Sequence, residues 1–500
     1  SGHYNAIYGT TAGAGMLDGR YNTVIGPHAG CDITSGDFNV AIGYNAQVSA
    51  TGDNQFIIGC GSSHWICGDS SFILYDKDGN KLGFNPDSQN NLYAGTGAGA
   101  CSDADTTYNI GIGYSAGYLL DSGDQNILLG TNAGRDLSSG TYNILFGHHA
   151  GCLASTAGST IGIGREVFGV GPLTGAHNIA MGCQAGCKAT SAAWSIFLGY
   201  QAGACYLSGN YNIAFGKNAL CGNASTGATG EQNIAIGCYA LRDICTGKVN
   251  IAIGSQSLCG NTTGCFNIAL GRSSGRSNTT GCVNVYIGEA TACDRTAGEY
   301  NIALGNHALQ GSATADGEYN IALGSLAGEC VSTGDGNIMM GRNAGKLSTS
   351  GCCNIFLGTY ASSTGTVTGS YNVVLGTNAA KTITSGHCNI ALGNLAGNQI
   401  IDGDNNVLLG VQSGKNIGSG TCNIFIGKDA GESSGTADDN DANQNIGLGH
   451  QVAMGLTCGD DNIMFGHETG RTTTTGGCNV LIGKQVCASS AAANCELVLG

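Results

Sequence analysis

The chain has 500 residues, of which 87 are Gly and 3 are Pro, and charged residues make up only 11% of it. Its net charge of −15, with 19 Lys and Arg residues, excludes nucleic acid and anionic membranes as default partners. No run approaches the roughly 18 apolar residues that a bilayer-spanning helix needs, so we expect no membrane insertion.

A five-residue motif, Asn-Φ-x-Φ-Gly with Φ apolar, recurs 27 times between Asn5 and Gly500, and 19 of the 26 successive spacings are 17 residues. The terminal Gly is present in all 27 copies, while the first position is relaxed in four of them, to Gln55, Thr160, Ser195 and Glu496. The full unit reads approximately N-I-A-I-G-x-x-A-G-x-x-x-T-x-G-x-Y. One such unit is too small to bury a core, but stacked copies can share one. The period therefore predicts an all-β, rod-shaped parallel β-solenoid of about 27 rungs, with one short strand in each 17-residue coil.

In chain order, the pattern predicts solenoid rungs over residues 1–59, a β-hairpin insertion over 60–90 and further rungs over 91–500. The insertion carries two aromatic residues and a histidine that are candidates for recognition: His64, Trp65 and Tyr75. Insertions in solenoids emerge as surface loops, where binding residues concentrate. Tolerated variation of an exposed loop is the alternative interpretation.

Equivalent residues of neighbouring coils should lie in register. The Asn at position one is then expected to form an amide ladder along the axis. Its representative members are Asn22, Asn39, Asn250, Asn267, Asn284 and Asn301. The aromatic residue that often precedes this Asn should form a second, less regular stack.

Strand alternation leads us to expect that positions two and four, such as Ile251 and Ile253, point inward against a small residue at position eight, such as Ala29. Position three would then face outward, although it holds residues such as Phe197 and never a charge. Soluble monomers rarely expose so long an apolar stripe. We therefore expect a homotrimer that covers this face, with a second sheet of the same chain as the alternative.

The 24 cysteines favour an oxidising, extracellular setting over a metal site. Residues one period apart should have Cα atoms about 5 Å apart, which is within the range of a disulfide. The firmest expected pairs are Cys265 with Cys282 and Cys478 with Cys495. Cys205 shares nearly the same phase with Cys187 and with Cys221, so at most one of these two bonds can form, and Cys60 with Cys67 could close a small loop. Reduced thiols packed as small hydrophobic residues are the alternative.

Other motifs give weaker signals. Three glycosylation sequons begin at Asn223, Asn261 and Asn278, in expected loops. Two Gly-x-Ser-x-Gly matches fall on the repeat's own glycine frame without a strand–turn–helix context, so we expect no catalytic site and no enzyme. Acidic loops, such as Asp402 with Asp404, offer oxygen ligands for Ca²⁺, but none has a calcium-loop pattern, so solvated loops without a metal or other cofactor are the main expectation.

The N-[IV]-A-[IL]-G-x-x-A repeats resemble the head repeats of trimeric autotransporter adhesins, and the longer form is similar to tail-fibre repeats of phages and large viruses. This resemblance extends over nearly the whole chain and implies a left-handed β-roll, trimerisation and attachment. The chain departs from it in its longer period and its many cysteines. The expected function is an extracellular structural fibre or filament subunit with an adhesive role, on a cell-surface appendage or a virion. The alternatives are a receptor- or glycan-binding viral tail fibre and, less favoured, an ice-binding solenoid.

Overall fold

The computed structural model describes residues 3–61, 63–68, 74–76, 81–82, 86–223, 227–433 and 440–500. These residues form 31 β-strands. In chain order the strands are β1 (Ala6–Tyr8), β2 (Thr23–Ile25), β3 (Val40–Ile42), β4 (Phe56–Cys60), β5 (Ser63–Gly68), β6 (Leu74–Asp76), β7 (Lys81–Leu82), β8 (Leu92–Ala94), β9 (Ile110–Ile112), β10 (Ile127–Leu129), β11 (Ile144–Phe146), β12 (Ile161–Ile163), β13 (Ile179–Met181), β14 (Ile196–Leu198), β15 (Ile213–Phe215), β16 (Ile234–Ile236), β17 (Ile251–Ile253), β18 (Ile268–Leu270), β19 (Val285–Ile287), β20 (Ile302–Leu304), β21 (Ile321–Leu323), β22 (Ile338–Met340), β23 (Ile355–Leu357), β24 (Val373–Leu375), β25 (Ile390–Leu392), β26 (Val407–Leu409), β27 (Ile424–Ile426), β28 (Ile446–Leu448), β29 (Ile463–Phe465), β30 (Val480–Ile482) and β31 (Leu497–Leu499).

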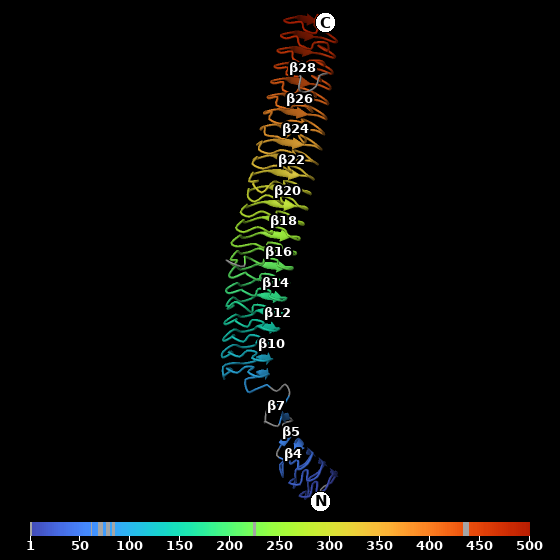
Figure 1. Ribbon diagram of the computed structural model, residues 1–500. Coiled ribbons are helices and arrows are strands. Elements are labelled where there is room, and N and C mark those ends of the chain that lie inside the picture. Colours follow the sequence, from blue (N-terminus) through green and yellow to red (C-terminus); the bar gives the residue numbers. More distant parts are fainter. Residues whose placement is uncertain are drawn as a thin grey trace.

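The predicted parallel β-solenoid is confirmed. Each strand from β8 to β30 pairs in parallel with the next strand in the chain, and β1 to β4 form a shorter stack of the same kind. The register follows the repeat, since Ile251 lies opposite Ile268 and Ile253 lies opposite Leu270. Figure 1 shows the coils piled into an elongated, gently bent rod with the strand arrows one above another.

The insertion interrupts this stack with antiparallel pairing. Strand β4 pairs in parallel with β3 along one edge and antiparallel with β5 along the other. Strands β5, β6 and β7 then continue as an antiparallel meander. The parallel stack resumes at β8.

Hydrogen bonds tie every coil to the coils on both sides. In the coil that begins at Asn250, the N–H of Ile251 donates to the carbonyl of Asn267 in the next coil at 2.8 Å. The N–H of Gly254 donates to Ile236 in the preceding coil at the same distance. Backbone groups outside the short strand therefore find partners along the axis, which buried polar groups require.

The expected direction of the strand side chains is wrong. The middle residue points inward in strands β2–β4 and β9–β30, so Ala252, Phe197 and Tyr286 are fully buried, whereas Ile253 is 40% exposed. The reason is the Asn at position one, which is buried itself. Strand alternation then places position three on the same inner side and positions two and four outside. The small residue at position eight faces the interior as expected, since Ala29 is fully buried.

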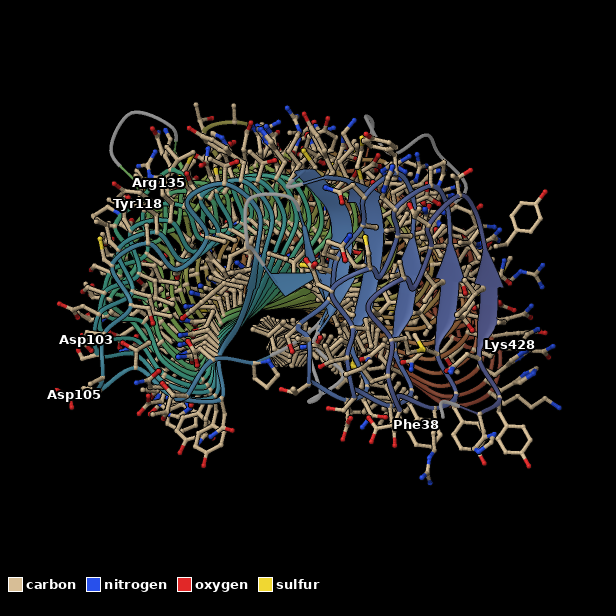
Figure 2. All side chains as sticks on the ribbon, turned by 90° about the horizontal axis from the view of Figure 1, so that it is seen from below. Phe38, Asp103, Asp105, Tyr118, Arg135 and Lys428 are labelled. Carbon is tan, nitrogen blue, oxygen red and sulfur yellow. The ribbon has the colours of Figure 1, made fainter. Side chains whose placement is uncertain are left out.

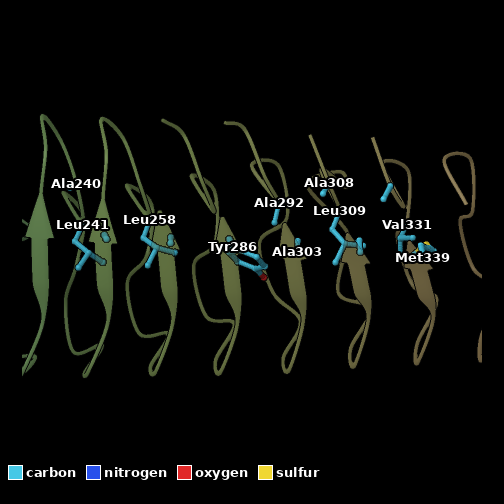
Figure 3. Packing of buried hydrophobic residues seen from close by; sticks show 14 of the residues in the cluster. Ala240, Leu241, Leu258, Tyr286, Ala292, Ala303, Ala308, Leu309, Val331 and Met339 are labelled. Atoms are coloured by element: carbon cyan, nitrogen blue, oxygen red, sulfur yellow. The ribbon is translucent and has the colours of Figure 1, made fainter. Parts of the chain in front are cut away.

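Core volume is shared between the middle strand residue and the residue six positions later. Phe197 faces Gly203, where an added Cβ would lie 2.4 Å from the Phe ring, while Ala252 is matched by a buried Leu258. Figure 3 shows this exchange in neighbouring coils, where leucines fill the space beside alanine strands and Tyr286 fills its own coil. The core therefore keeps its packing density although the identity of its large residue changes from coil to coil.

The glycine that ends each motif is fixed by the close approach of the next coil. Gly254 has φ +131°, a conformation that residues with a side chain rarely adopt. A Cβ on it would also lie 2.5 Å from the carbonyl oxygen of Gly271. The same steric limit recurs in successive coils, which explains why this position never varies.

Candidate interaction surface

The asparagines of position one form a continuous internal ladder. The Asn250 amide Nδ2 donates to Asn233 Oδ1 at 3.0 Å and to the carbonyl of Gly264 at 2.9 Å. Its Oδ1 accepts the backbone N–H of Asn267 at 3.0 Å. Asn22, Asn39, Asn284 and Asn301 occupy the same position and repeat the contact with the backbone N–H.

A second ladder, which the sequence pattern did not reveal, runs along position 16. There the side chain of one coil accepts the backbone N–H of the same position in the preceding coil, as Asp37 Oδ1 does from Arg20 and Asp404 Oδ1 does from His387, both at 2.6 Å. Cysteine sulfur fills this role too. Cys282 Sγ accepts the N–H of Cys265 at 3.1 Å, and Cys265 Sγ accepts that of Lys248 at 3.4 Å.

The predicted disulfides are wrong, because no disulfide bond occurs among the described residues, which include all 24 cysteines. In a parallel stack, equivalent Cα–Cβ bonds point the same way. The Cβ atoms of Cys265 and Cys282, or of Cys478 and Cys495, therefore keep the inter-strand spacing of about 4.8 Å instead of the ~3.8 Å of a disulfide. The expected closure of Cys60 on Cys67 also fails.

Cys60 and Cys67 are held apart by the antiparallel register of the insertion. Cys60 lies opposite Ser63, next to the turn, whereas Cys67 lies opposite Ile57. Two other strand residues therefore stand between them along the β4–β5 ladder.

Three thiols in successive coils interact without bonding. A hydrogen bond with the Cys221 thiol, together with the charge of Lys188, lowers the pKa of Cys205 to about 6. Burial raises the pKa of Cys187 to about 11. Of the hydrogen-bonded pair Cys205 and Cys221, Cys205 is the thiol whose surroundings favour the thiolate.

Two of the three expected glycosylation sites are wrong. Asn261 and Asn278 are fully buried, and each donates through Nδ2 to a glycine carbonyl of its own coil, Gly264 and Gly281. A glycan cannot be attached to an amide inside the core. Asn223 is half-buried, and the rest of its sequon lies outside the described residues.

The acidic loops and the serine motifs are built into the coil contacts. Asp460 Oδ1 accepts the backbone N–H of Asn443, and the hydroxyl of Ser273 donates to Gln256. Within the described parts of the chain no group of three His, Cys, Asp or Glu side chains is placed to hold a metal ion. His64 and Trp65 lie on β5 and Tyr75 lies on β6, but their side chains are outside the described set.

The most extensive unassigned feature is an exposed apolar surface on the outside of the strands. It consists of the first and third residues of β1–β4 and β8–β31, and we call it the strand face. Among these 28 strands the two positions hold no charged residue, and Thr23 is the one polar residue. Its more exposed members include Phe215 at 56%, Phe146 at 53% and Leu375 at 48%.

Short stacks of exposed aromatic residues, which we call the aromatic column, border parts of the strand face where the chain enters some of the strands. Tyr21 stacks between Tyr4 and Phe38, with ring centroids 5.1 and 4.8 Å apart. Tyr300 and Tyr319 stack at 4.9 Å in the same phase. Figure 2, which looks along the rod, shows Phe38 projecting outward from the coils. This column therefore widens the apolar surface.

Opposite charges flank the strand face on its two sides. The position two residues after each strand holds six exposed cationic side chains and one acidic side chain, Glu289, and we call it the basic margin. Three residues before the strand, nine acids form the acidic margin, against Arg20 and Lys248. The basic margin comprises Arg165, Lys217, Arg272, Arg342, Lys428 and Lys484. The acidic margin comprises Asp37, Asp53, Asp124, Glu231, Glu299, Glu318, Asp335, Asp404 and Asp460.

A hollow of about 310 Å³ lies beside the basic margin. The charges that line it are paired between coils, Arg272 with Glu289 and Arg276 with Asp294. Such exposed pairs each contribute little to stability, typically about 0.2–1 kcal/mol. The hollow is therefore a gap between side chains that neutralise one another.

Comparisons with known proteins leave the chain without a family. No protein-family model matches it, and no curated protein is significantly similar to it. In the described portion there is also no helix long and apolar enough to cross a membrane.

Proposed function

We propose that this chain is a structural, extracellular rod, a fibre or filament subunit that assembles with copies of itself and presents adhesive surface loops. The observation that carries this proposal is the unbroken stack from β8 to β31, in which each strand pairs in register with the next. At about 4.8 Å per coil, these 24 coils extend roughly 115 Å. Shape of this kind suits spacing and display.

The internal ladders support a structural role because they stiffen the rod. Asn250 links its coil to both neighbours through one buried side chain, while the carbonyl of Asn267 and the N–H of Gly254 add backbone bonds in the two axial directions. Since most of the described coils repeat these contacts, bending or stretching the rod must distort many hydrogen bonds together. Stiffness is the property that a spacer or fibre requires.

Adhesion would come from weak contacts repeated along the rod. Segments that interrupt the 17-residue period, including the 60–90 insertion, are candidates for these contacts, and weak contacts gain avidity when several copies are displayed together. The similarity of the repeats to adhesin heads and tail fibres supports a cell-surface or virion location.

Electron microscopy of the purified protein and a binding assay test this proposal. We expect thin rods at least ~115 Å long, and beads coated with them should adhere to cells or immobilised glycans. A chain in which residues 61–85 are replaced by a short Gly-Ser linker should keep the rod and lose part of the adhesion. Compact particles would contradict the structural role, and rods that bind none of these surfaces would contradict the adhesive one.

Glycan binding by the rod itself is the second candidate. The column of His177, Trp194 and Tyr211 is stacked and exposed, with Trp194 at 54%, and sugars bind to aromatic side chains. Substitution of Trp194→Ala should then reduce binding on a glycan array at least tenfold. A matched Phe38→Ala variant in the N-terminal stack shows whether the effect belongs to this cluster.

A further inference from the structure

We infer that the strand face is an interface between copies of this chain, which associate side by side and in parallel about an axis that runs along the rod. This inference deepens the proposed function and rests on it for the role of the assembly. The partner of the strand face is another copy of the same chain.

The composition of the strand face is unusual for a surface exposed to solvent. The chain as a whole carries 34 acidic and 19 basic residues, yet neither outward position of the 28 parallel strands bears a charge. Solvent-facing strand positions normally alternate with the core as polar residues. Here the outward positions hold mainly Ile, Leu, Val, Phe and Met, and the inward position holds apolar residues or Gly, so neither face is polar. Such a pattern is typical of a strand that is covered on both sides.

The area of the strand face is also large for a surface exposed to solvent. Three residues of strand are about 10 Å wide and 24 strands about 115 Å long, so the stripe covers on the order of 1,100 Å². The largest apolar patch of a typical monomer measures about 300–600 Å². A stable dimer buries about 800 Å² per partner. The strand face is therefore large enough to hold two rods together before its aromatic border is counted.

The repeat itself favours a second copy of the chain over an unrelated partner. The ridges on the strand face recur at the strand spacing of about 4.8 Å along its whole length. A partner without this spacing would lose register after a few coils, while an identical rod stays matched at every coil. Identical partners also close into a symmetric assembly that leaves no stripe uncovered.

Charge complementarity then fixes the relative direction. When two rods are related by rotation about an axis along the rod, the basic margin of one, such as Arg342 and Lys484, lies opposite the acidic margin of the other, such as Asp335. The same holds for three rods around a threefold axis. In an antiparallel pair the like margins would meet and repel. Parallel association is the arrangement that the margins favour.

The experiment compares three chains by sedimentation equilibrium. The wild-type chain should have the mass of two or three 50.2 kDa chains. The triple variant Phe146→Glu, Phe215→Glu and Leu375→Glu should sediment as a monomer, with at least a 100-fold weaker association. The matched control Tyr118→Glu, Leu119→Glu and Val170→Glu changes three similarly exposed apolar residues outside the strand face and should keep the wild-type mass. A monomeric wild type, or a triple variant with the wild-type mass, would overturn the inference.

A photocross-linking amino acid in place of Met340, in the otherwise native chain, tests direction without disturbing the fold. Parallel rods should give cross-links to strand-face residues of another copy within a few coils of residue 340. Cross-links to distant coils would overturn the parallel arrangement, and none at all would overturn the interface. A monomer that still forms rods in the microscope would sink this inference and leave the proposed structural role standing.

Discussion

Two regions of the same stack hold very different cores. In coils β10 and β11 the interior is filled by Leu128, Leu137 and Leu145. In coils β17 to β19 the equivalent interior includes Asn261 and Arg295, both fully buried. The strands and the Asn ladder keep the same register in both regions. The ladder and the glycines therefore define the coil, while the core needs only to be filled.

The polar-core coils carry an evident energetic cost. Among the described residues, Asn261 Oδ1, Asn278 Oδ1, Tyr286 OH and Arg295 Nε are buried without a hydrogen-bond partner. Arg295 does use its other nitrogens, which donate to the carbonyls of Val331 at 3.0 Å and Gly317 at 2.6 Å. Burial lowers the pKa of Arg295. We expect these coils to open more readily than the apolar ones.

The largest effect should come from breaking the ladder, and it should be equal in the two regions. Asn126→Ala and Asn250→Ala each remove the acceptor of a buried N–H, from Asn143 and Asn267 respectively, and two donors. We expect about 4–6 kcal/mol lower free energy of local opening, from one orphaned group and lost hydrogen bonds. Hydrogen exchange of the amides in the flanking coils measures it.

Serine is the matched control for the ladder. At Ser195, one of the four natural exceptions, the hydroxyl still accepts the N–H of Asn212 at 3.2 Å. Asn126→Ser and Asn250→Ser should therefore lose about half as much as the alanine variants. A loss that differs strongly between the two regions would show that the core, and not the ladder, determines coil stability.

Core volume should produce the next largest effect. Phe197→Ala should cost about 3–5 kcal/mol because it empties a buried aromatic site. Adding Gly203→Leu should restore about half of the lost stability, because the pair then matches Ala252 with Leu258. Leu258 itself has a positive φ of 46°, so leucine is found in this backbone conformation in its own coil. Gly203→Leu alone should destabilise, because its side chain meets the Phe197 ring. Denaturant unfolding of the three variants tests this, and additive effects would refute the exchange.

A smaller loss is expected at the invariant glycine. Gly254→Ala should cost about 3 kcal/mol, from a glycine-only conformation and a contact with the next coil. Gly336→Asn is the control, because Gly336 has φ +64° and a Cβ there would meet only Cys353 Sγ at 3.6 Å. That variant should unfold within about 0.5 kcal/mol of the wild type, as is usual for surface substitutions. Equal losses at both sites would mean that positive φ alone is responsible.

The period, the register and the Asn ladder could be predicted from the sequence because the 17-residue pattern repeats them in every coil. The inward face was misassigned, since Ile-Ala-Ile fits either direction by hydrophobicity; the deciding fact is the burial of the preceding Asn. The disulfide pairs failed for a similar reason. Sequence phase brings Cys265 near Cys282, but their side chains point in the same direction and the two thiols remain unbonded. The margins needed the strand bounds before they could be recognised.

The smallest effect should have the opposite sign and removes the difference between the two regions. Asn261→Leu with Asn278→Leu replaces two buried amides whose oxygens lack partners, at a position where Leu137 fits in an apolar coil. The carbonyl of Gly264 keeps Asn250 as a donor at 2.9 Å. We therefore expect about 1–2 kcal/mol of added stability, the desolvation cost of an unpaired polar group. The reverse variant, Leu137→Asn, should destabilise by at least as much. If hydrogen exchange instead slows in neither coil, the buried amides hold partners such as ordered water, and the polar core is a built feature and not a cost.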